Sequence, residues 1–229
     1  MKKKFNINKS YKNFYRRKKE IIYPAEAVIR IFKGSFPKLK LKFKKKQKIL
    51  DSGYGDGRHL VFFKKIGLDP WGMEISKDIN SSFVRLEKKF NKKKLLVGNS
   101  SSIPAKNKFF DFILSWNSIY YMSITQKKDF KISVKELSRV LKRRGKIIVS
   151  IPKKTAFIYK KAKTIKKGYV QIKKDFFNMR NGEVMRKFEN EKEIKKEFSK
   201  YFKKFNFSSV KIDWFGLNYH FHIFIAEKK

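Results

Sequence analysis

Short apolar runs alternate with longer amphipathic stretches through the middle of the chain. Four of the runs have the length that is typical of buried strands, and a fifth, of two residues, indicates the end of one. They lie at residues 49–50, 68–75, 94–97, 109–115 and 146–152. The intervening stretches at 77–90 and 126–143 are long enough for helices, and the second has apolar side chains at helical spacing. Strands that alternate with helices in this way predict an α/β fold built on a parallel sheet.

The pattern differs on either side of this alternation. Before it, Tyr23-Pro24-Ala25-Glu26 predicts the start of a helix that ends near Gly34, because proline and an acidic residue both suit a first turn. After it, residues 153–189 form an insert in which Asn181-Gly182 predicts a β-hairpin turn. The remaining predicted segments are a helix at 191–202 and two strands at 207–215 and 219–226.

The first strand leads directly into a glycine-rich segment, Asp51-Ser52-Gly53-Tyr54-Gly55-Asp56-Gly57-Arg58. A turn of this kind between a strand and a helix brings backbone N–H groups close to a ligand. The dinucleotide fingerprint G-x-G-x-x-G fails, because its third glycine would stand at Arg58, and the Gly-Lys-Ser/Thr of a P-loop does not occur. The segment keeps the spacing D-x-G-x-G-x-G, which belongs to neither of these ligand classes.

An acidic residue stands at the end of the predicted second strand. Glu74 follows Asp51 by 23 residues. A carboxylate about 20 residues beyond a glycine-rich turn can accept hydrogen bonds from both hydroxyls of a ribose. The alternative is an exposed carboxylate at a strand end, but position and residue type together favour ribose binding.

The D-x-G-x-G-x-G segment resembles motif I of the class I S-adenosylmethionine (SAM) dependent methyltransferases, with Ser52 and Tyr54 in place of a common Leu and Cys. A second segment, R-V-L-K-R-R-G-K-I-I-V at 139–149, is similar to the passage from helix to strand five in that family. The resemblance covers about residues 20–227. It implies a Rossmann-like three-layer sandwich whose seven-stranded sheet is mostly parallel with an antiparallel last strand, here with a β-hairpin insert after strand five.

The same resemblance divides the chain into two parts. We expect a basic N-terminal tail at 1–19 and a SAM-dependent methyltransferase domain at 20–229, within which the insert 153–189 covers the acceptor pocket. SAM is the implied methyl donor, and no metal is predicted.

The resemblance also implies roles for single residues. Gly53 and Gly55 would let the backbone approach the methionine end of SAM, and Asp51 would orient the loop or the cofactor's amino group. Asn99 stands where the family often has Asp, and its amide oxygen could accept from the adenine amino group. The candidate cofactor-binding residues are Asp51, Ser52, Gly53, Gly55, Arg58, Glu74, Ile75, Asn99, Ser100 and Trp116.

Polar and aromatic residues follow the predicted fourth strand, at the edge where open α/β sheets bind ligands. The candidate substrate-binding residues are Tyr23, Asn117, Tyr120 and Tyr121. Tyr23, Tyr120, Tyr121 and His59 are the candidates for a general base, although His59 is better explained as a structural residue of the first helix. The catalytic residues remain unassigned.

Two histidines and the absence of cysteine bear on metal binding. His220 and His222 share one strand face, but no acidic partner is obvious, and strand packing explains them better. The chain has no cysteine, which excludes disulfides, thiolate metal sites and thiol nucleophiles.

The net charge of +41 predicts attraction to polyanions. However, the 60 basic residues comprise 50 Lys and 10 Arg, and Phe, Ile and Asn are also abundant. Because these residues share AT-rich codons, we favour genome composition over a dedicated nucleic-acid surface.

We therefore predict methyl transfer from SAM to a small-molecule acceptor. Two alternatives stay open: an RNA or protein methyltransferase that uses the basic surface, and a SAM-binding module without turnover. Ser115-Trp116-Asn117-Ser118 stands where an N-P-P-Y or D-P-P-Y signature would indicate base methylation, so nucleic acid is the less favoured partner. No signal peptide or transmembrane segment is predicted, and we expect a cytoplasmic protein.

Overall fold

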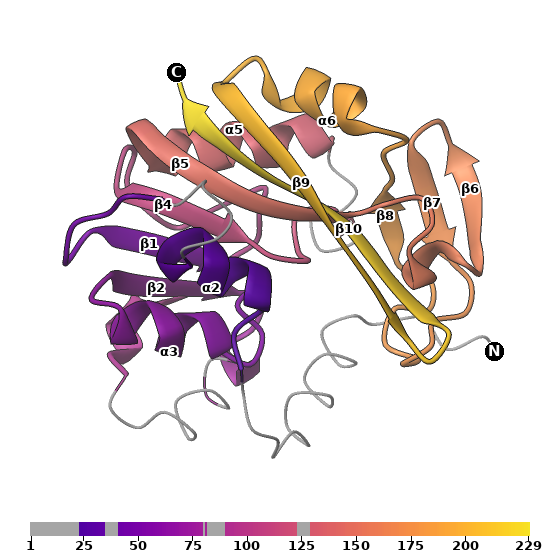
Figure 1. The fold of residues 1–229 in the computed structure, drawn as a ribbon, viewed down its shortest axis with the longest axis horizontal. Coiled ribbons are helices and arrows are strands. Elements are labelled where there is room, and N and C mark those ends of the chain that lie inside the picture. Colours follow the sequence, from indigo (N-terminus) through magenta and orange to yellow (C-terminus); the bar gives the residue numbers. More distant parts are fainter. Residues whose placement is uncertain (1–22, 35–40, 80, 82–89, 123–128) are drawn as a thin grey trace.

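A computed structural model of the 229-residue chain describes residues 23–34, 41–79, 81, 90–122 and 129–229. The expected tail at 1–19 and most of the expected helix at 77–90 therefore lie outside the described residues. Its main feature is a seven-stranded sheet with the strand order β3-β2-β1-β4-β5-β10-β9 (Figure 1). These strands are β1 (Lys48–Ser52), β2 (Asp69–Glu74), β3 (Leu95–Val97), β4 (Phe110–Ser115), β5 (Leu141–Pro152), β9 (Phe202–Trp214) and β10 (Leu217–Lys228).

The sheet is mostly parallel, as expected. Strands β1 to β5 pair in parallel, whereas β10 runs antiparallel to both of its neighbours, β5 and β9. The carboxyl ends of β1, β2, β3 and β4 therefore meet at one edge of the sheet. The predicted Rossmann-like fold class is confirmed.

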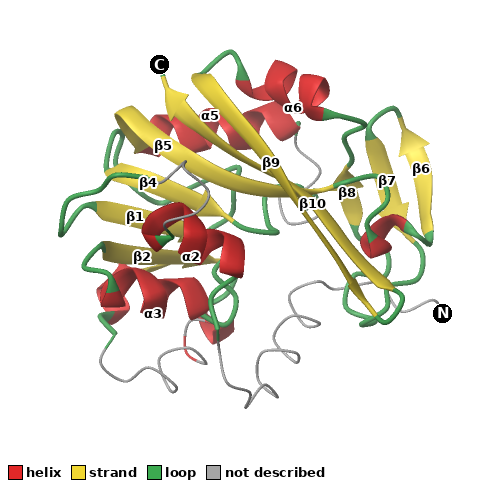
Figure 2. Ribbon diagram, in the orientation of Figure 1, coloured by secondary structure: helices red, strands yellow, loops and turns green. Residues whose placement is uncertain are grey.

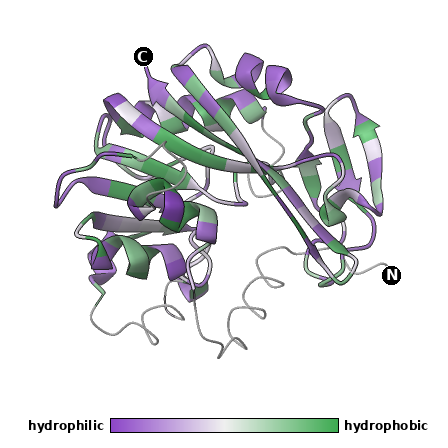
Figure 3. Ribbon diagram, viewed as in Figure 1, coloured by the Kyte–Doolittle hydropathy of each residue, from purple (hydrophilic) through white to green (hydrophobic). Residues whose placement is uncertain are grey.

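Helices cover both faces of the sheet, which gives three layers (Figure 2). One apolar cluster packs α2 (Glu26–Lys33) and α3 (Arg58–Lys65) on one face, and another packs α5 (Phe130–Val140) and α6 (Glu191–Phe198) on the other. Strand β5 shows the alternation directly, because Ile147 and Val149 belong to the second cluster and Ile148 to the first. In Figure 3, β5 and β10 carry apolar bands, whereas α6 is mostly hydrophilic.

The boundary between α5 and β5 lies earlier in the chain than expected. The helix ends at Val140 rather than at Arg143, and β5 begins at Leu141. Arg144 has a positive φ of 60°, and the β4–β5 register shifts between Phe110 and Phe112. The run of basic residues therefore forms an irregular start of the strand, which the helical pattern in the sequence does not indicate.

The insert is larger than the expected hairpin. It contains a short 3₁₀ helix, η2 (Phe157–Tyr159), and a three-stranded antiparallel sheet of β6 (Ala162–Lys166), β7 (Tyr169–Ile172) and β8 (Val184–Arg186). Strands β7 and β8 form the expected pair, but 11 residues join them instead of a two-residue turn at Asn181-Gly182. The extra strand β6 was not predicted, because most of its side chains are exposed and give no buried alternation.

Backbone hydrogen bonds join the insert to the segment after β4. Tyr121 pairs with Met185 in an isolated bridge, the Arg186 N–H donates to Tyr120 O (2.9 Å), and the Met122 N–H donates to Val184 O (2.8 Å). The insert is consequently fixed beside the carboxyl end of β4.

Candidate functional site

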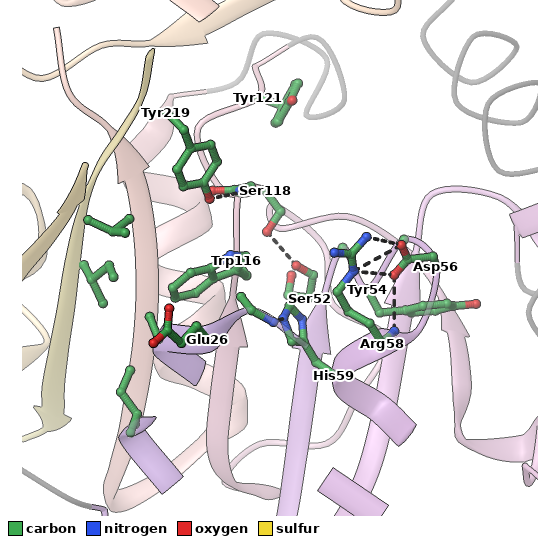
Figure 4. Close-up of a pocket in the computed structure, with 18 of the residues that line it drawn as sticks. Glu26, Ser52, Tyr54, Asp56, Arg58, His59, Trp116, Ser118, Tyr121 and Tyr219 are labelled. Atoms are coloured by element: carbon green, nitrogen blue, oxygen red, sulfur yellow. Dashed lines mark hydrogen bonds and ion pairs between the residues drawn. The ribbon is translucent and has the colours of Figure 1, made fainter. Parts of the chain in front are cut away.

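A cavity of about 810 Å³ lies at the carboxyl edge of the parallel strands. Its wall comes from the segments after β1, β2, β3 and β4, from α2, from the insert and from the β9–β10 hairpin (Figure 4). Eleven of the candidate cofactor- and substrate-binding residues line it, as does His59, a candidate general base: Ser52, Gly53, Gly55, Arg58, Glu74, Ile75, Asn99, Ser100, Trp116, Asn117 and Tyr121.

The glycine-rich segment forms one wall of the cavity, in a backbone conformation that favours glycine. Gly53, Gly55 and Gly57 all have positive φ, of 79°, 60° and 81°. A Cβ on Gly53 would also lie 2.6 Å from Ser118 Cβ, closer than real contacts allow. Ser118 Oγ donates to Ser52 O (2.5 Å), so the segments after β1 and β4 are joined across the sheet edge.

Glu74 binds the glycine-rich segment from the neighbouring strand. Its Oε1 accepts from the Gly55 N–H (2.7 Å) and its Oε2 from the Ile75 N–H (3.2 Å). Burial raises its pKa to about 7, against the lowering effect of these two hydrogen bonds, while nearby Asp51 raises it further. A carboxylate can accept about four hydrogen bonds, so capacity remains for a ligand in the cavity.

Asp51 lies beneath the cavity and does not line it. It is fully buried, and burial raises its pKa against the opposing hydrogen bond from His59. His59 Nδ1 lies 3.4 Å from Asp51 Oδ2, and His59 Nε2 accepts from the Ala25 N–H (3.3 Å). His59 thus connects β1 to the start of α2, in agreement with a structural role.

Arg58 is held by its neighbour. Asp56 Oδ1 accepts from Arg58 Nε (2.9 Å), and the two side chains form an ion pair in the cavity wall (Figure 4). The charge of this predicted cofactor-binding residue is therefore compensated locally.

The segment after β4 is fixed by a polar network. Asn117, at a positive φ of 54°, donates from Nδ2 to the Tyr219 hydroxyl (3.0 Å), and its Oδ1 accepts from Ser150 Oγ (2.7 Å). Burial raises the pKa of Tyr219 despite the hydrogen bonds from Asn117 and Trp116. Tyr219 and Trp116 face the cavity with Ser118 (Figure 4).

Asn99 uses its amide oxygen within its own turn. Asn99 Oδ1 accepts from both the N–H (2.9 Å) and the Oγ (2.7 Å) of Ser101. Those two bonds occupy the oxygen that we expected to accept from an adenine amino group.

Two predicted substrate residues lie outside the cavity. Tyr23 is 70% exposed to solvent and does not line the cavity. Tyr120 is 1% exposed and stacks on Tyr121 with 4.9 Å between ring centroids. Burial raises the pKa of Tyr120 well above its ordinary value, so its hydroxyl keeps its proton at neutral pH. Both tyrosines belong to an apolar cluster with the insert, but of the two it is Tyr121 that lines the cavity.

Several wall residues were not predicted. They are Glu26 and Arg30 of α2, Met179 and Arg180 of the insert, and a stretch of β9 with Tyr219 of β10. These segments are far apart in the sequence, so no local motif indicates them. For Arg180, the one available signal was its position beside the Asn181-Gly182 turn.

No group of three or more His, Cys, Asp or Glu that could hold a metal ion occurs in the described part of the chain. His222 lies 3.7 Å from Glu191, and burial is the main reason that its pKa falls to about 4. Within the described ranges, no helix combines the length and the hydropathy needed to cross a membrane.

The sheet order, with the glycine-rich segment at its carboxyl edge, is the fold of class I SAM-dependent methyltransferases. Residues 50–149 match the family model described as methyltransferase domain. An uncharacterized protein of Methanocaldococcus jannaschii is 31% identical over 141 residues, which cover 62% of this chain and 57% of that protein.

Solved structures agree on the fold. A SAM-dependent methyltransferase of Methanosarcina mazei superposes with a TM-score of 0.66 at 16% identity, covering 90% of this chain and 99% of that one. The 1,6-didemethyltoxoflavin-N1-methyltransferase of Burkholderia thailandensis, with its substrate and S-adenosylhomocysteine bound, superposes with a TM-score of 0.58 at 13% identity, covering 81% and 72%.

Proposed function

We propose that this protein transfers a methyl group from SAM to a small-molecule acceptor. The observation that carries the proposal is the cavity itself, which joins a glycine-rich wall and a strand-end carboxylate to an aromatic and apolar wall. Its volume of about 810 Å³ lies within the range of small-molecule sites, roughly 300–1,000 Å³.

The residues present fit SAM on two structural grounds. The wall at Gly53 has no room for a Cβ, so the backbone itself faces the cavity there. Glu74 keeps acceptor capacity for ribose hydroxyls, and Ile75, Asn99 and Ser100 extend the same wall. Trp116 and Asn117 would border the methionine end.

SAM supplies an already activated methyl group when bound, so the protein's main task is to orient the acceptor. Alignment of two reactants at near-attack distance can provide a large part of a rate enhancement. The Asn117–Tyr219 hydrogen bond and the contact between Ser118 and Ser52 fix the wall beside the proposed methyl position. We assign no general base.

The composition of the wall favours a small acceptor over RNA. Its charged side chains are Glu26, Asp56 and Glu74 with Arg30, Arg58 and Arg180. In the described part of the chain, none of the 50 lysines lines the cavity. A site for a polyanion would use the abundant positive charge. The Burkholderia thailandensis enzyme, whose name states a small-molecule substrate, is consistent with this proposal.

Calorimetry with SAM and S-adenosylhomocysteine tests cofactor binding. Glu74→Ala should weaken binding by roughly 1–3 kcal/mol, because the ribose hydroxyls lose a hydrogen-bond acceptor. Glu189→Ala, which removes an exposed carboxylate remote from the cavity wall, is the matched control and should bind normally. Preference for NADH over SAM would refute the assignment.

Turnover requires a second measurement. Formation of S-adenosylhomocysteine should be followed with pooled metabolites and, separately, with RNA and protein substrates. Activity confined to the metabolite pools supports the proposal, and activity confined to RNA or protein supports the macromolecular alternative. If the protein binds the cofactor but forms product with none of the pools, a binding module without turnover would be favoured.

A further inference from the structure

Arg180 occupies an unusual position in the cavity wall. It belongs to the segment between β7 and β8 and is only 7% exposed, yet it lines the cavity. Its Nη2 lies 2.9 Å from Oδ1 of the buried Asp175. The centre of its guanidinium lies 5.5 Å and 5.6 Å from the rings of Phe157 and Phe177. The insert therefore holds a positive charge in a defined place between aromatic rings.

The choice of arginine is informative in this chain. Lysine outnumbers arginine by 50 to 10, yet every basic residue of the described cavity wall is arginine. Arg30 pairs with Glu26, and Arg58 pairs with Asp56. Lysine provides a point charge, whereas a guanidinium provides a planar fork that matches carboxylate and phosphate groups.

We propose that the methyl acceptor carries an anionic group, a carboxylate or a phosphate, and that Arg180 binds this group. The inference rests on the proposed function. A guanidinium has five N–H donors in a fixed geometry, so a single group can hold Asp175 and a second anion together. Tyr121 and Met179 line the same cavity and supply aromatic and apolar surface for the rest of the acceptor.

A purely structural role for the Arg180–Asp175 pair makes a different prediction. Asp175 also organises its own loop, because its Oδ2 accepts from the Met179 N–H (3.0 Å) and its N–H donates to Asn181 Oδ1 (2.6 Å). If the pair only closes this loop, removal of either partner should weaken every ligand. If Arg180 binds an anion, Asp175 opposes that anion electrostatically, and the two substitutions should act in opposite directions.

The test uses matched pairs of small probes on the full chain saturated with S-adenosylhomocysteine. The pairs are benzoate with benzamide and phenyl phosphate with phenol, titrated calorimetrically at about 150 mM salt to screen surface lysines. Wild type should prefer the charged member of at least one pair, and the pair that shows this preference distinguishes carboxylate from phosphate. Arg180→Gln should weaken the charged probe about tenfold or more, the effect of losing a charge-assisted hydrogen bond.

Two further variants make the result specific. Asp175→Asn should strengthen binding of the charged probe several-fold, because a competing negative charge is removed while an amide oxygen remains. Arg186→Gln removes another buried insert arginine, which pairs with Glu197 and does not line the cavity, and it should leave probe binding unchanged.

Three outcomes would overturn the inference: neither charged probe binds wild type, neutral and charged probes bind alike, or Asp175→Asn and Arg180→Gln both weaken binding. Titration of S-adenosylhomocysteine into the same proteins separates this inference from the proposed function. Normal cofactor binding with any of these outcomes rejects only the role of Arg180. Absence of cofactor binding in wild type rejects the proposed function itself.

Discussion

Gly53 meets two separate constraints in the glycine-rich segment. Its φ of 79° disfavours any side chain, and a Cβ would lie 2.6 Å from Ser118 Cβ. Gly216, in the β9–β10 turn, has a φ of 91° but nothing within 4 Å of the same position. The two glycines therefore separate backbone strain from steric contact.

We expect Gly53→Ala to destabilise the protein more than Gly216→Ala. The strain of a left-handed alanine costs about 1–2 kcal/mol at either position. Gly53→Ala adds a contact between two backbone-fixed segments, for a total of roughly 3 kcal/mol or more. Urea unfolding of both variants measures the difference, and equal losses would contradict the steric part of the explanation.

Glu74 should make stability depend on pH. Its folded-state pKa is about 7 against an ordinary 4.5, so the folded protein retains a proton between these values that the unfolded chain has lost. The contribution is fully present below about pH 4.5 and is lost as pH rises through about 7, by roughly 3 kcal/mol. Glu74→Gln imitates the protonated acid and lacks this titration.

Urea unfolding between pH 5 and 8 tests this expectation. Wild type should lose stability relative to Glu74→Gln as pH rises, with most of the change before about pH 7.5. Asp51, the acidic neighbour that raises this pKa, is present in both proteins, so the difference isolates Glu74. A constant difference across the range would show that Glu74 does not titrate in this interval.

At the residue scale, the sequence could predict local chemistry but not tertiary position. The positions of Gly53 and Glu74 follow from a strand, a turn and a fixed spacing, all of which are local. Tyr120 and Tyr121 are adjacent, identical in type and both buried, yet Tyr121 lines the cavity and Tyr120 does not. That difference depends on backbone pairing with Met185 and Arg186, more than 60 residues away.

At the scale of elements, α2 provides a simple test of packing. Phe32 is fully buried, and its ring meets those of Phe43, Phe63 and Phe112 at centroid distances of 5.9, 5.2 and 6.0 Å. We expect Phe32→Ala to cost about 3–5 kcal/mol, because a large cavity would form between α2 and the sheet. Thermal or urea unfolding measures this loss.

Lys33→Ala is the matched control in the same helix. Lys33 is exposed, so its truncation should change the free energy of unfolding by no more than about 0.5 kcal/mol. A small effect of Phe32→Ala would indicate that α2 contributes little to stability.

The strands of the sheet were predictable because their apolar runs are short and bounded by turn residues. Element boundaries were less predictable where burial does not follow the local pattern. The helix before β5 ends at Val140 because Leu141 pairs with Phe110. Strand β6 has four exposed residues among five, so its pairing with β7 leaves no periodic signal.

At the scale of the whole molecule, the excess of positive charge does not extend into the cavity wall. The chain carries a net charge of +41, whereas the described cavity wall has as many acidic as basic side chains. This distribution supports a compositional origin for most of the lysines.

We expect RNA binding to be non-specific and strongly dependent on salt. Any such polycation releases counterions, and 6–10 phosphate contacts would lose ~10³–10⁵ in affinity between about 50 and 200 mM salt. Titration of several RNAs over this range should show uniform loss without sequence or shape preference. Tight, selective binding near physiological salt that weakens on removal of residues 1–19 would instead support an RNA substrate.

The position of β10 sets the order in which the sheet can be completed during synthesis. Strand β9 precedes β10 in the chain, but among the described strands its partner is β10, which in turn pairs with β5. Phe224 of β10 lies opposite both Val149 of β5 and Phe207 of β9. Until β10 emerges, β5 presents an open edge and β9 has no strand to join, which is the kind of intermediate that chaperones recognise.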